Sequence, residues 1–353
     1  MDQVTNRRRG AGLIAADPRL SAGGYTLFTP QTDDGNVYLV DSKGTVAHRW
    51  KLPNRPGRHA VILPNGNLGY NGSHPNSKTL YPMWSVWHGG MFSEVTPAGK
   101  VVWEFEDKTH HHDAAWLPNG NLLYGAAEPL PKNILGPETL YGDVVKEVNR
   151  KGELVWRWSA AEHLNPSDFP INPLFERVHW PLINGVWETR AGLILMSLRT
   201  TSGIIAVDKK SGRVIYHFGP DIVSHQHSPV ELPSGNILIF DNGNYRAGVS
   251  TSYSRVIEVN PATKAIEWQY TDAPRQSFYC PFMGNAQRLW NGNTHITDAA
   301  GGRLFEVTPT GQIVWEYVIP FFGEYPGEAH QFQAGAQNTT FRSYRYSKDQ
   351  VRL

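Results

Sequence analysis

The sequence predicts an all-β fold, a six-bladed β-propeller built from four-stranded blades. Six strand-like segments carry one large aromatic residue each, at intervals of 47 to 60 residues: Trp50, Trp103, Trp156, Tyr216, Trp268 and Trp315. Before each one comes a second short strand, such as "FSEVT" or "VIEVN", and most pairs are joined by a tight polar turn. The 353 residues also include 34 Gly, 25 Pro and 12 Trp. A period near 50 residues with several short strands per repeat is typical of propeller blades.

Each repeat contains four expected strands, A to D. Strand A precedes a turn such as "LPNGN", strand B follows it, strand C is the "EV" segment, and strand D carries the aromatic residue. The first repeat begins at "GYTLF" and lacks strand A, whereas "AHQFQAGA" at 329–336 follows the last repeat. We expect this C-terminal segment to complete blade 1 and close the ring, which leaves no open sheet edge. The expected boundaries are an N-terminal extension at 1–19, one propeller at 20–338 and a tail at 339–353.

Loop lengths indicate which face of the propeller carries the site. The A–B and C–D turns are short, whereas the long connections are D–A or B–C loops, at 71–90, 126–143, 159–180 and 241–254. These loops emerge on one face of a four-stranded meander, and long irregular loops on a rigid scaffold commonly carry function. Because the A strands line the central channel, their first residues lie at the mouth that these loops surround.

Histidines recur at this mouth. His59, His112 and His227 begin A strands, His330 lies in the expected closing strand, and His179 stands just before an A strand, whereas blade 6 has Asn285. A single histidine could simply hydrogen-bond a neighbouring blade, but five around one mouth indicate a pocket of titratable groups. Arg199 and Arg255 stand at matching B–C positions and favour an anionic ligand. Trp180 and Tyr279 are expected to form part of an aromatic wall.

Bulk properties exclude some partners. The chain has 33 Lys and Arg against 32 Asp and Glu, which gives no broad electrostatic footprint for nucleic acid. No apolar run approaches the roughly 20 residues needed to span a bilayer. A small molecule is the expected partner, and the oligomeric state is open. Cys280 is the one cysteine, and "MDQVTNRRRGAG" has no apolar segment behind it. The sequence as written therefore predicts a cytoplasmic protein, or a periplasmic or secreted one if a signal peptide was removed.

The sequence predicts no required cofactor. The motif "HHHD" at 110–113 suggests a metal site. Adjacent histidines on a strand, however, point to opposite faces and cannot all bind one ion. If a divalent metal binds, we expect His112 and His227, from different blades, to hold it. The Cys and His spacing of structural zinc sites, the GxSxG nucleophile motif and the glycine-rich nucleotide loops are all absent.

The chain resembles the arylsulfotransferase-like six-bladed propellers over most of blades 3 to 6. The most specific segments are "QHSPVELPSGNILIFDNG" and "SRVIEV". The resemblance implies transfer of a sulfuryl group between phenols without a nucleotide donor, by histidines and an arginine, with one histidine transiently sulfated. It places His227, Arg255 and Arg199 on family site positions. Arg303 stands where the family has its sulfated histidine. Leu182 stands where the family has a second histidine, in blade 4, and His179 lies three residues before it.

We therefore expect an enzyme that acts on a small anionic, aromatic substrate by arylsulfotransferase-like group transfer. The expected catalytic residues are His227, His112, Arg255 and His179. The expected substrate-binding residues are His59, Arg199, His330, Arg303, Tyr279, Asn285 and Trp180. Two alternatives are open: a lyase or hydrolase with a histidine general base and arginine charge neutralisation, and a non-catalytic binding propeller with structural histidines.

Overall fold

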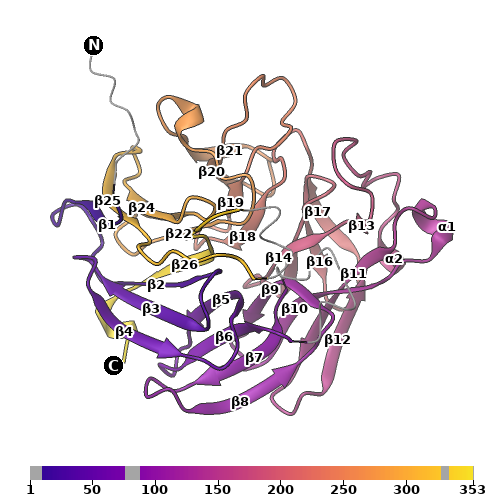
Figure 1. Ribbon diagram of the computed structural model, residues 1–353. Coiled ribbons are helices and arrows are strands. Elements are labelled where there is room, and N and C mark those ends of the chain that lie inside the picture. The colour runs from indigo at the N-terminus through magenta and orange to yellow at the C-terminus, as the bar shows by residue number, and fades with distance from the viewer. Residues whose placement is uncertain (1–9, 76–87, 327–333, 353) are drawn as a thin grey trace.

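A computed structural model of the protein describes residues 10–75, 88–326 and 334–352. Six small antiparallel sheets are arranged in a ring around a central channel, with strand A of each sheet innermost (Figure 1). The predicted six-bladed propeller is confirmed. The helical segments within these residues are short: α1 (Lys132–Leu135), α2 (Ala160–His163), η3 (Arg275–Ser277) and η5 (Lys348–Gln350).

Every blade runs from strand A at the channel to strand D at the outside. The strands of blades 1 to 3 are β26 (Thr340–Tyr346), β2 (Tyr25–Pro30), β3 (Asn36–Asp41) and β4 (Val46–Lys51); β5 (Pro56–Ile62), β6 (Leu68–Ser73), β7 (Gly90–Val95) and β8 (Val101–Glu106); and β9 (His110–Trp116), β10 (Leu122–Pro129), β11 (Tyr141–Val148) and β12 (Leu154–Ser159). Those of blades 4 to 6 are β14 (Ile183–Glu188), β15 (Leu193–Leu198), β16 (Gly203–Asp208) and β17 (Val214–Phe218); β18 (His227–Glu231), β19 (Ile237–Asp241), β20 (Arg255–Val259) and β21 (Ile266–Tyr270); and β22 (Asn285–Arg288), β23 (Thr294–Asp298), β24 (Arg303–Val307) and β25 (Ile313–Val318).

Five of the six repeating aromatic residues join one blade to the next. In each case the indole Nε1 donates a hydrogen bond of 2.8 to 3.1 Å to a carbonyl in the C–D turn of the following blade: Trp50 to Thr96, Trp103 to Arg150, Trp156 to Lys209, Trp268 to Pro309 and Trp315 to Ser42. Because the last of these returns from blade 6 to blade 1, the series runs around the ring. Tyr216 holds the equivalent place in blade 4. A buried tryptophan commonly combines apolar packing with one such donor contact.

The strand that closes the ring is a different segment from the expected one. β26 pairs with β2, with Tyr346 opposite Tyr25 and Ser343 opposite Phe28. It lies at 340–346, within the expected tail, rather than at 329–336. Residues 327–333 lie outside the described part of the chain, and 334–336 form no strand. The physical reason is composition, because "TFRSYRY" has the aromatic and hydroxyl residues that fit a pleated sheet, whereas "AHQFQAGA" is rich in Ala and Gly.

Two further strands extend the blades. β1 (Gly12–Ala16) pairs antiparallel with β25 and adds a fifth, outer strand to blade 6. It lies within the stretch 1–19 that the sequence suggested as an extension. β13 (His179–Trp180) pairs in parallel with the start of β11 in blade 3. The pairing of β13 fixes the position of the loop that carries His179, one of the candidate site residues.

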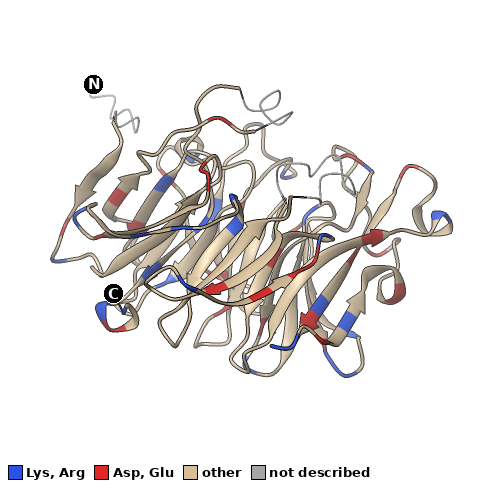
Figure 2. Cartoon of the chain, turned by 60° about the horizontal axis from the view of Figure 1, so that its bottom comes forward, with Lys and Arg blue, Asp and Glu red and all other residues tan. Residues whose placement is uncertain are grey.

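Charged side chains of both signs are interspersed over the strands and loops (Figure 2), in keeping with the balanced composition. None of the helices in the described residues is long and apolar enough to cross a membrane.

Candidate functional site

The A strands are irregular where they begin. Five of the six have a register shift against strand B in their first half: β5, β9, β14, β18 and β26. A β-bulge bends the strand and redirects side chains, and bulges are frequent beside functional sites. The strands are therefore regular toward the A–B turns and irregular at the mouth of the channel.

Arg58 lies in the bulged part of β5, directly before His59. It is only 1% exposed, and its Nε donates a 3.1 Å hydrogen bond to the carbonyl of His111. Its Nη2 has no hydrogen-bond partner among the described residues. Burial lowers the pKa of Arg58 to about 9. A guanidinium stays charged at neutral pH in proteins, so blade 2 places a poorly compensated cation at the mouth.

Arg199 supplies a second cation from the end of β15. Its Nε donates to Nε2 of His225, a buried residue of the D–A loop before β18. Burial lowers the pKa of Arg199 to about 10. Within residues 10–75, 88–326 and 334–352, neither Arg58 nor Arg199 forms an ion pair with a carboxylate. Buried cations of this kind favour a nearby anionic group.

His112 lies near enough to both arginines for their charges to act on it. Burial and then the positive charge of Arg58, with a smaller contribution from Arg199, lower the pKa of His112 well below its usual value. Its Nδ1 is 2.8 Å from Nδ1 of His111. The expectation that adjacent histidines face apart is wrong here, because the bulge between His110 and Ala114 interrupts the alternation of β9.

His111 continues into a second cluster with Asp143 and His179. Nε2 of His111 is 2.8 Å from Oδ1 of Asp143, and Nε2 of His179 is 3.1 Å from the same oxygen. All three side chains are at most 1% exposed. The backbone N–H of Leu182 donates a 2.7 Å hydrogen bond to Oδ2. Among the described residues, the ligand atoms of this trio lie within 4.8 Å of one another, so these are the side chains that could hold a metal ion. The sequence had suggested His112 and His227.

His227 is buried, and both of its ring nitrogens contact neighbours. Nδ1 is 2.7 Å from Oδ1 of Asn242, and Nε2 accepts a 3.2 Å hydrogen bond from the backbone N–H of Met283. Since Asn242 in turn donates to the carbonyls of Cys280 and Met283, His227 joins blade 5 to the loop that leads into blade 6.

Arg255 and Arg303, unlike Arg58 and Arg199, have carboxylate partners. Nε of Arg255 donates to Asp241 at 2.7 Å, and Nε of Arg303 donates to Glu316 at 2.7 Å. Asp272 lies 3.5 Å from Arg303 as well. Both arginines are therefore held in ion pairs, Arg255 by a carboxylate that it shares with Arg246.

The other residues that the sequence indicated lie in varied places. Asn285 makes two hydrogen bonds to the backbone of Ser343, and Trp180 is buried with its indole bonded to the carbonyl of Phe169. Tyr279 is 39% exposed. His59 lies farther down the channel, and His330 lies outside the described residues.

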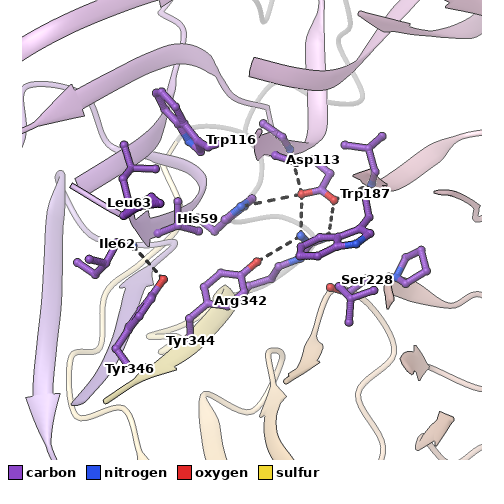
Figure 3. A pocket seen from close by; sticks show the side chains of 17 residues that line it. His59, Ile62, Leu63, Asp113, Trp116, Trp187, Ser228, Arg342, Tyr344 and Tyr346 are labelled. Carbon is purple, nitrogen blue, oxygen red and sulfur yellow. Dashed lines mark hydrogen bonds and ion pairs between the residues drawn. The ribbon is translucent and has the colours of Figure 1, made fainter. Parts of the chain in front are cut away.

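A buried ion pair crosses the channel below the mouth. Arg342 of β26 binds Asp113 of β9 through two bonds of 2.7 and 2.8 Å, and the backbone N–H of Val186 in β14 also donates to Asp113 (Figure 3). The pair itself lines a cavity of about 240 Å³, together with His59, Trp116, Trp187, Tyr344, Tyr346 and neighbouring residues. Asp113 directly follows His112 in β9, so the lining of this cavity begins at the residue next to His112.

Four site residues were not predicted from the sequence: Arg58, His111, His225 and Asp143. The first three lie close to predicted residues. Arg58 directly precedes His59, and His111 directly precedes His112, so the correct strands were identified. His225 stands two residues before His227 in the same phrase. Nothing in the local sequence marks Asp143, because it reaches His111 and His179 only through the pairing of β9, β10, β11 and β13.

Fold and site together define a β-propeller with buried arginines and histidines where its innermost strands begin. The sequence model of the family described as arylsulfotransferase (ASST) matches residues 14–223, and the chain belongs to this family. A second model, described as outer membrane protein assembly factor BamB, matches residues 142–342. A search of curated proteins finds no match.

Solved structures with a similar fold are distant in sequence. A protein of unknown function from Bacteroides caccae is 14% identical, with a TM-score of 0.57 over 92% of this chain and 100% of that one. A streptogramin B lyase is 11% identical, with a TM-score of 0.47 over 90% of this chain and 85% of that one. Virginiamycin B lyase from Staphylococcus aureus is 12% identical, with a TM-score of 0.44 over 76% and 71%. These likenesses concern the fold alone.

Proposed function

We propose that the protein is a sulfotransferase that moves a sulfuryl group from an aryl sulfate to a phenol, without a nucleotide donor. The observation that carries the proposal is the pair of buried guanidinium groups, Arg58 and Arg199. Among the described residues they have no carboxylate partner, and the charges of both lower the pKa of His112. Membership of the arylsulfotransferase family supports it. A sulfate ester supplies the negative oxygens that such a pair would bind.

In the proposed reaction, the arginines bind the non-bridging oxygens of the sulfuryl group and stabilise the charge that develops on them. A ring nitrogen of His112 attacks sulfur, an N–S bond forms, and the S–O bond to the aryl group breaks to release a phenolate. An acceptor phenol then attacks sulfur through its oxygen, loses its proton to the released phenolate or to solvent, and the N–S bond breaks. His112 is the candidate nucleophile because its Nδ1 contacts His111, which fixes the ring, and because the charges of both arginines act on it.

The test measures nitrophenolate release from 4-nitrophenyl sulfate with phenol as acceptor. We expect Arg58→Met and Arg199→Met each to lower kcat/KM roughly 100-fold to 1,000-fold, the range seen when one stabilising donor is removed. His112→Ala should abolish transfer. The matched control is Arg288→Met, which removes an arginine already paired with Glu258 near an A–B turn and should leave kcat/KM near wild type.

Two outcomes would contradict the proposal. One is a folded wild-type protein that releases no nitrophenolate from any of a panel of aryl sulfates. The other is a His112→Ala variant that retains wild-type turnover. Mass spectrometry of the protein quenched during turnover provides a second readout, because a sulfated His112 adds the mass of one sulfuryl group to its peptide.

A lyase is the second candidate, favoured by the series of contacts from Asp143 through His111 to His112. A carboxylate behind an imidazole is typical of general-base arrangements, and the two arginines would neutralise a substrate carboxylate and the enolate that forms from it. The two candidates differ in their dependence on an acceptor. A lyase would form a carbon–carbon double bond, seen as new ultraviolet absorbance, at a rate that does not change with phenol concentration.

A further inference from the structure

The cluster of His111, Asp143 and His179 is not explained by anion binding. Its three side chains come from three strands of blade 3, β9, β11 and β13, and are buried to the same degree. The parallel pairing of β13 with β11 sets Tyr141 opposite His179 and thereby fixes His179 beside Asp143. The cluster is rigid because each member lies in a paired strand.

The geometry differs from that of an ordinary hydrogen-bonded trio. Nε2 of His179 lies 3.1 Å from Oδ1 of Asp143 in hydrogen-bonding geometry. Nε2 of His111 is closer to this oxygen, at 2.8 Å, but this contact does not meet hydrogen-bonding geometry. Three buried ligand atoms therefore converge on one small space without an ideal hydrogen-bond arrangement between them.

The spacing suits an ion of the size of zinc. Ligand atoms placed about 2.0–2.2 Å from a tetrahedral ion stand about 3.2–3.6 Å from one another. The contacts of 2.8 and 3.1 Å, in a trio that spans no more than 4.8 Å, need only small adjustments to reach this arrangement. Three protein ligands leave one position of such an ion for water.

The surroundings hold the ligands as metal sites require. The backbone N–H of Leu182 occupies Oδ2 of Asp143 and leaves Oδ1 toward the two histidines. Nδ1 of His111 faces His112, so only Nε2 of His111 points into the cluster. Such outer contacts orient ligands in known metal sites. Two imidazole nitrogens with one carboxylate suit zinc and its neighbours better than calcium or magnesium, which prefer oxygen.

We propose that His111, Asp143 and His179 bind one divalent transition-metal ion, zinc in the first instance. The ion positions His111 and, through the contact between the two Nδ1 atoms, His112. It holds β13 and the D–A loop of blade 3 against β11. The site is independent of the sulfotransferase proposal, because either can fail while the other stands.

The test uses untagged full-length protein. The metal content of the protein as purified is measured by mass spectrometry, and protein stripped with a chelator is titrated with zinc chloride by calorimetry. We expect one ion per chain, a melting temperature raised by several degrees on zinc addition, and visible absorption bands when cobalt replaces zinc. His179→Gln and Asp143→Asn should each abolish binding of the ion.

The controls separate this trio from other histidines. His227→Gln should bind zinc like the wild type, which also decides against the pair His112 and His227 as ligands. His295→Gln, a change at a buried histidine of blade 6, should do the same. If Asp143→Asn does not fold, His179→Gln alone decides. Stripped, folded wild-type protein that takes up neither zinc nor cobalt at millimolar concentration would overturn the proposal, as would unchanged zinc binding by His179→Gln.

Discussion

The ion pair of Asp113 and Arg342 shows what burial does to single residues of this channel. The two side chains are 2% and 6% exposed and meet through two short bonds. Such a pair balances two desolvation costs against one strong attraction. Removing one partner leaves the other charge buried without an ion of opposite sign.

We expect Asp113→Ala to lower the free energy of unfolding by about 3–5 kcal/mol, because it strands the Arg342 charge in the channel. The double change Asp113→Leu with Arg342→Met should recover most of this loss, since the channel then loses both charges. Urea denaturation of Asp113→Leu, of Arg342→Met and of the double variant measures the coupling. A double variant as unstable as the sum of the single changes would contradict this account.

At the scale of elements, the blades are regular on their outer strands and irregular on their innermost ones. The indole hydrogen bonds of the D strands hold neighbouring blades at a fixed spacing. The bulges at the start of the A strands release the side chains there from strict alternation. The site is therefore built by departures from the repeat.

The identity of the closing strand can be tested by proline substitution. Ser343 lies in the middle of β26, and its backbone N–H donates to Asn285 and to Thr297. Ser343→Pro should lower the free energy of unfolding by about 3 kcal/mol or more, because it removes this donor and strains the strand. Ala334→Pro, in the exposed segment first expected to close the ring, is the matched control and should change stability little. Thermal melting of both variants checks the assignment, and equal losses would refute it.

The sequence predicted the architecture because the repeat is written locally, in turns and aromatic residues that recur in every blade. It misplaced the closing strand because neither "AHQFQAGA" nor "TFRSYRY" is followed by the "LPNGN" turn that marks the other A strands, so the local sequence did not decide between the two segments. In the site it indicated His112 and Arg199 but not Arg58 or Asp143. The bulges in β5 and β9 set the directions of Arg58 and His111, and strand pairing places Asp143 beside His111. Neither the bulges nor the pairing can be predicted from the residues next to these positions in the sequence.

At the scale of the whole molecule, buried histidines couple stability to pH. Burial lowers the pKa of His59, His225, His227 and His295 well below the usual value near 6.5. In the pH window below 6.5, the unfolded chain therefore binds more protons than the folded one, and stability falls as pH falls. Each unit of lowered pKa corresponds to about 1.4 kcal/mol per group.

His295 allows a clean measurement of this effect. Nε2 lies 2.7 Å from Oγ of Ser343, and the positive charge of Arg345 adds to burial in opposing protonation. We expect the free energy of unfolding of the wild type to drop between pH 7 and pH 5, and the drop to be smaller in His295→Gln, which cannot be protonated. Urea titrations at both pH values give the two differences. Identical drops in the two proteins would show that His295 does not contribute.

The ring closure has a consequence for the order in which the protein can be made. Thr29 and Thr340, which share a hydrogen bond between β2 and β26, are 311 residues apart in the chain. A ribosome therefore releases β2 long before its partner exists, and the inner edge of blade 1 stays open while five further blades emerge. Asp113 is likewise synthesised long before Arg342, so the ion pair in the channel forms only at the final step of assembly. Nascent chains of this protein should depend on chaperones most at the stage when every blade but the first is complete.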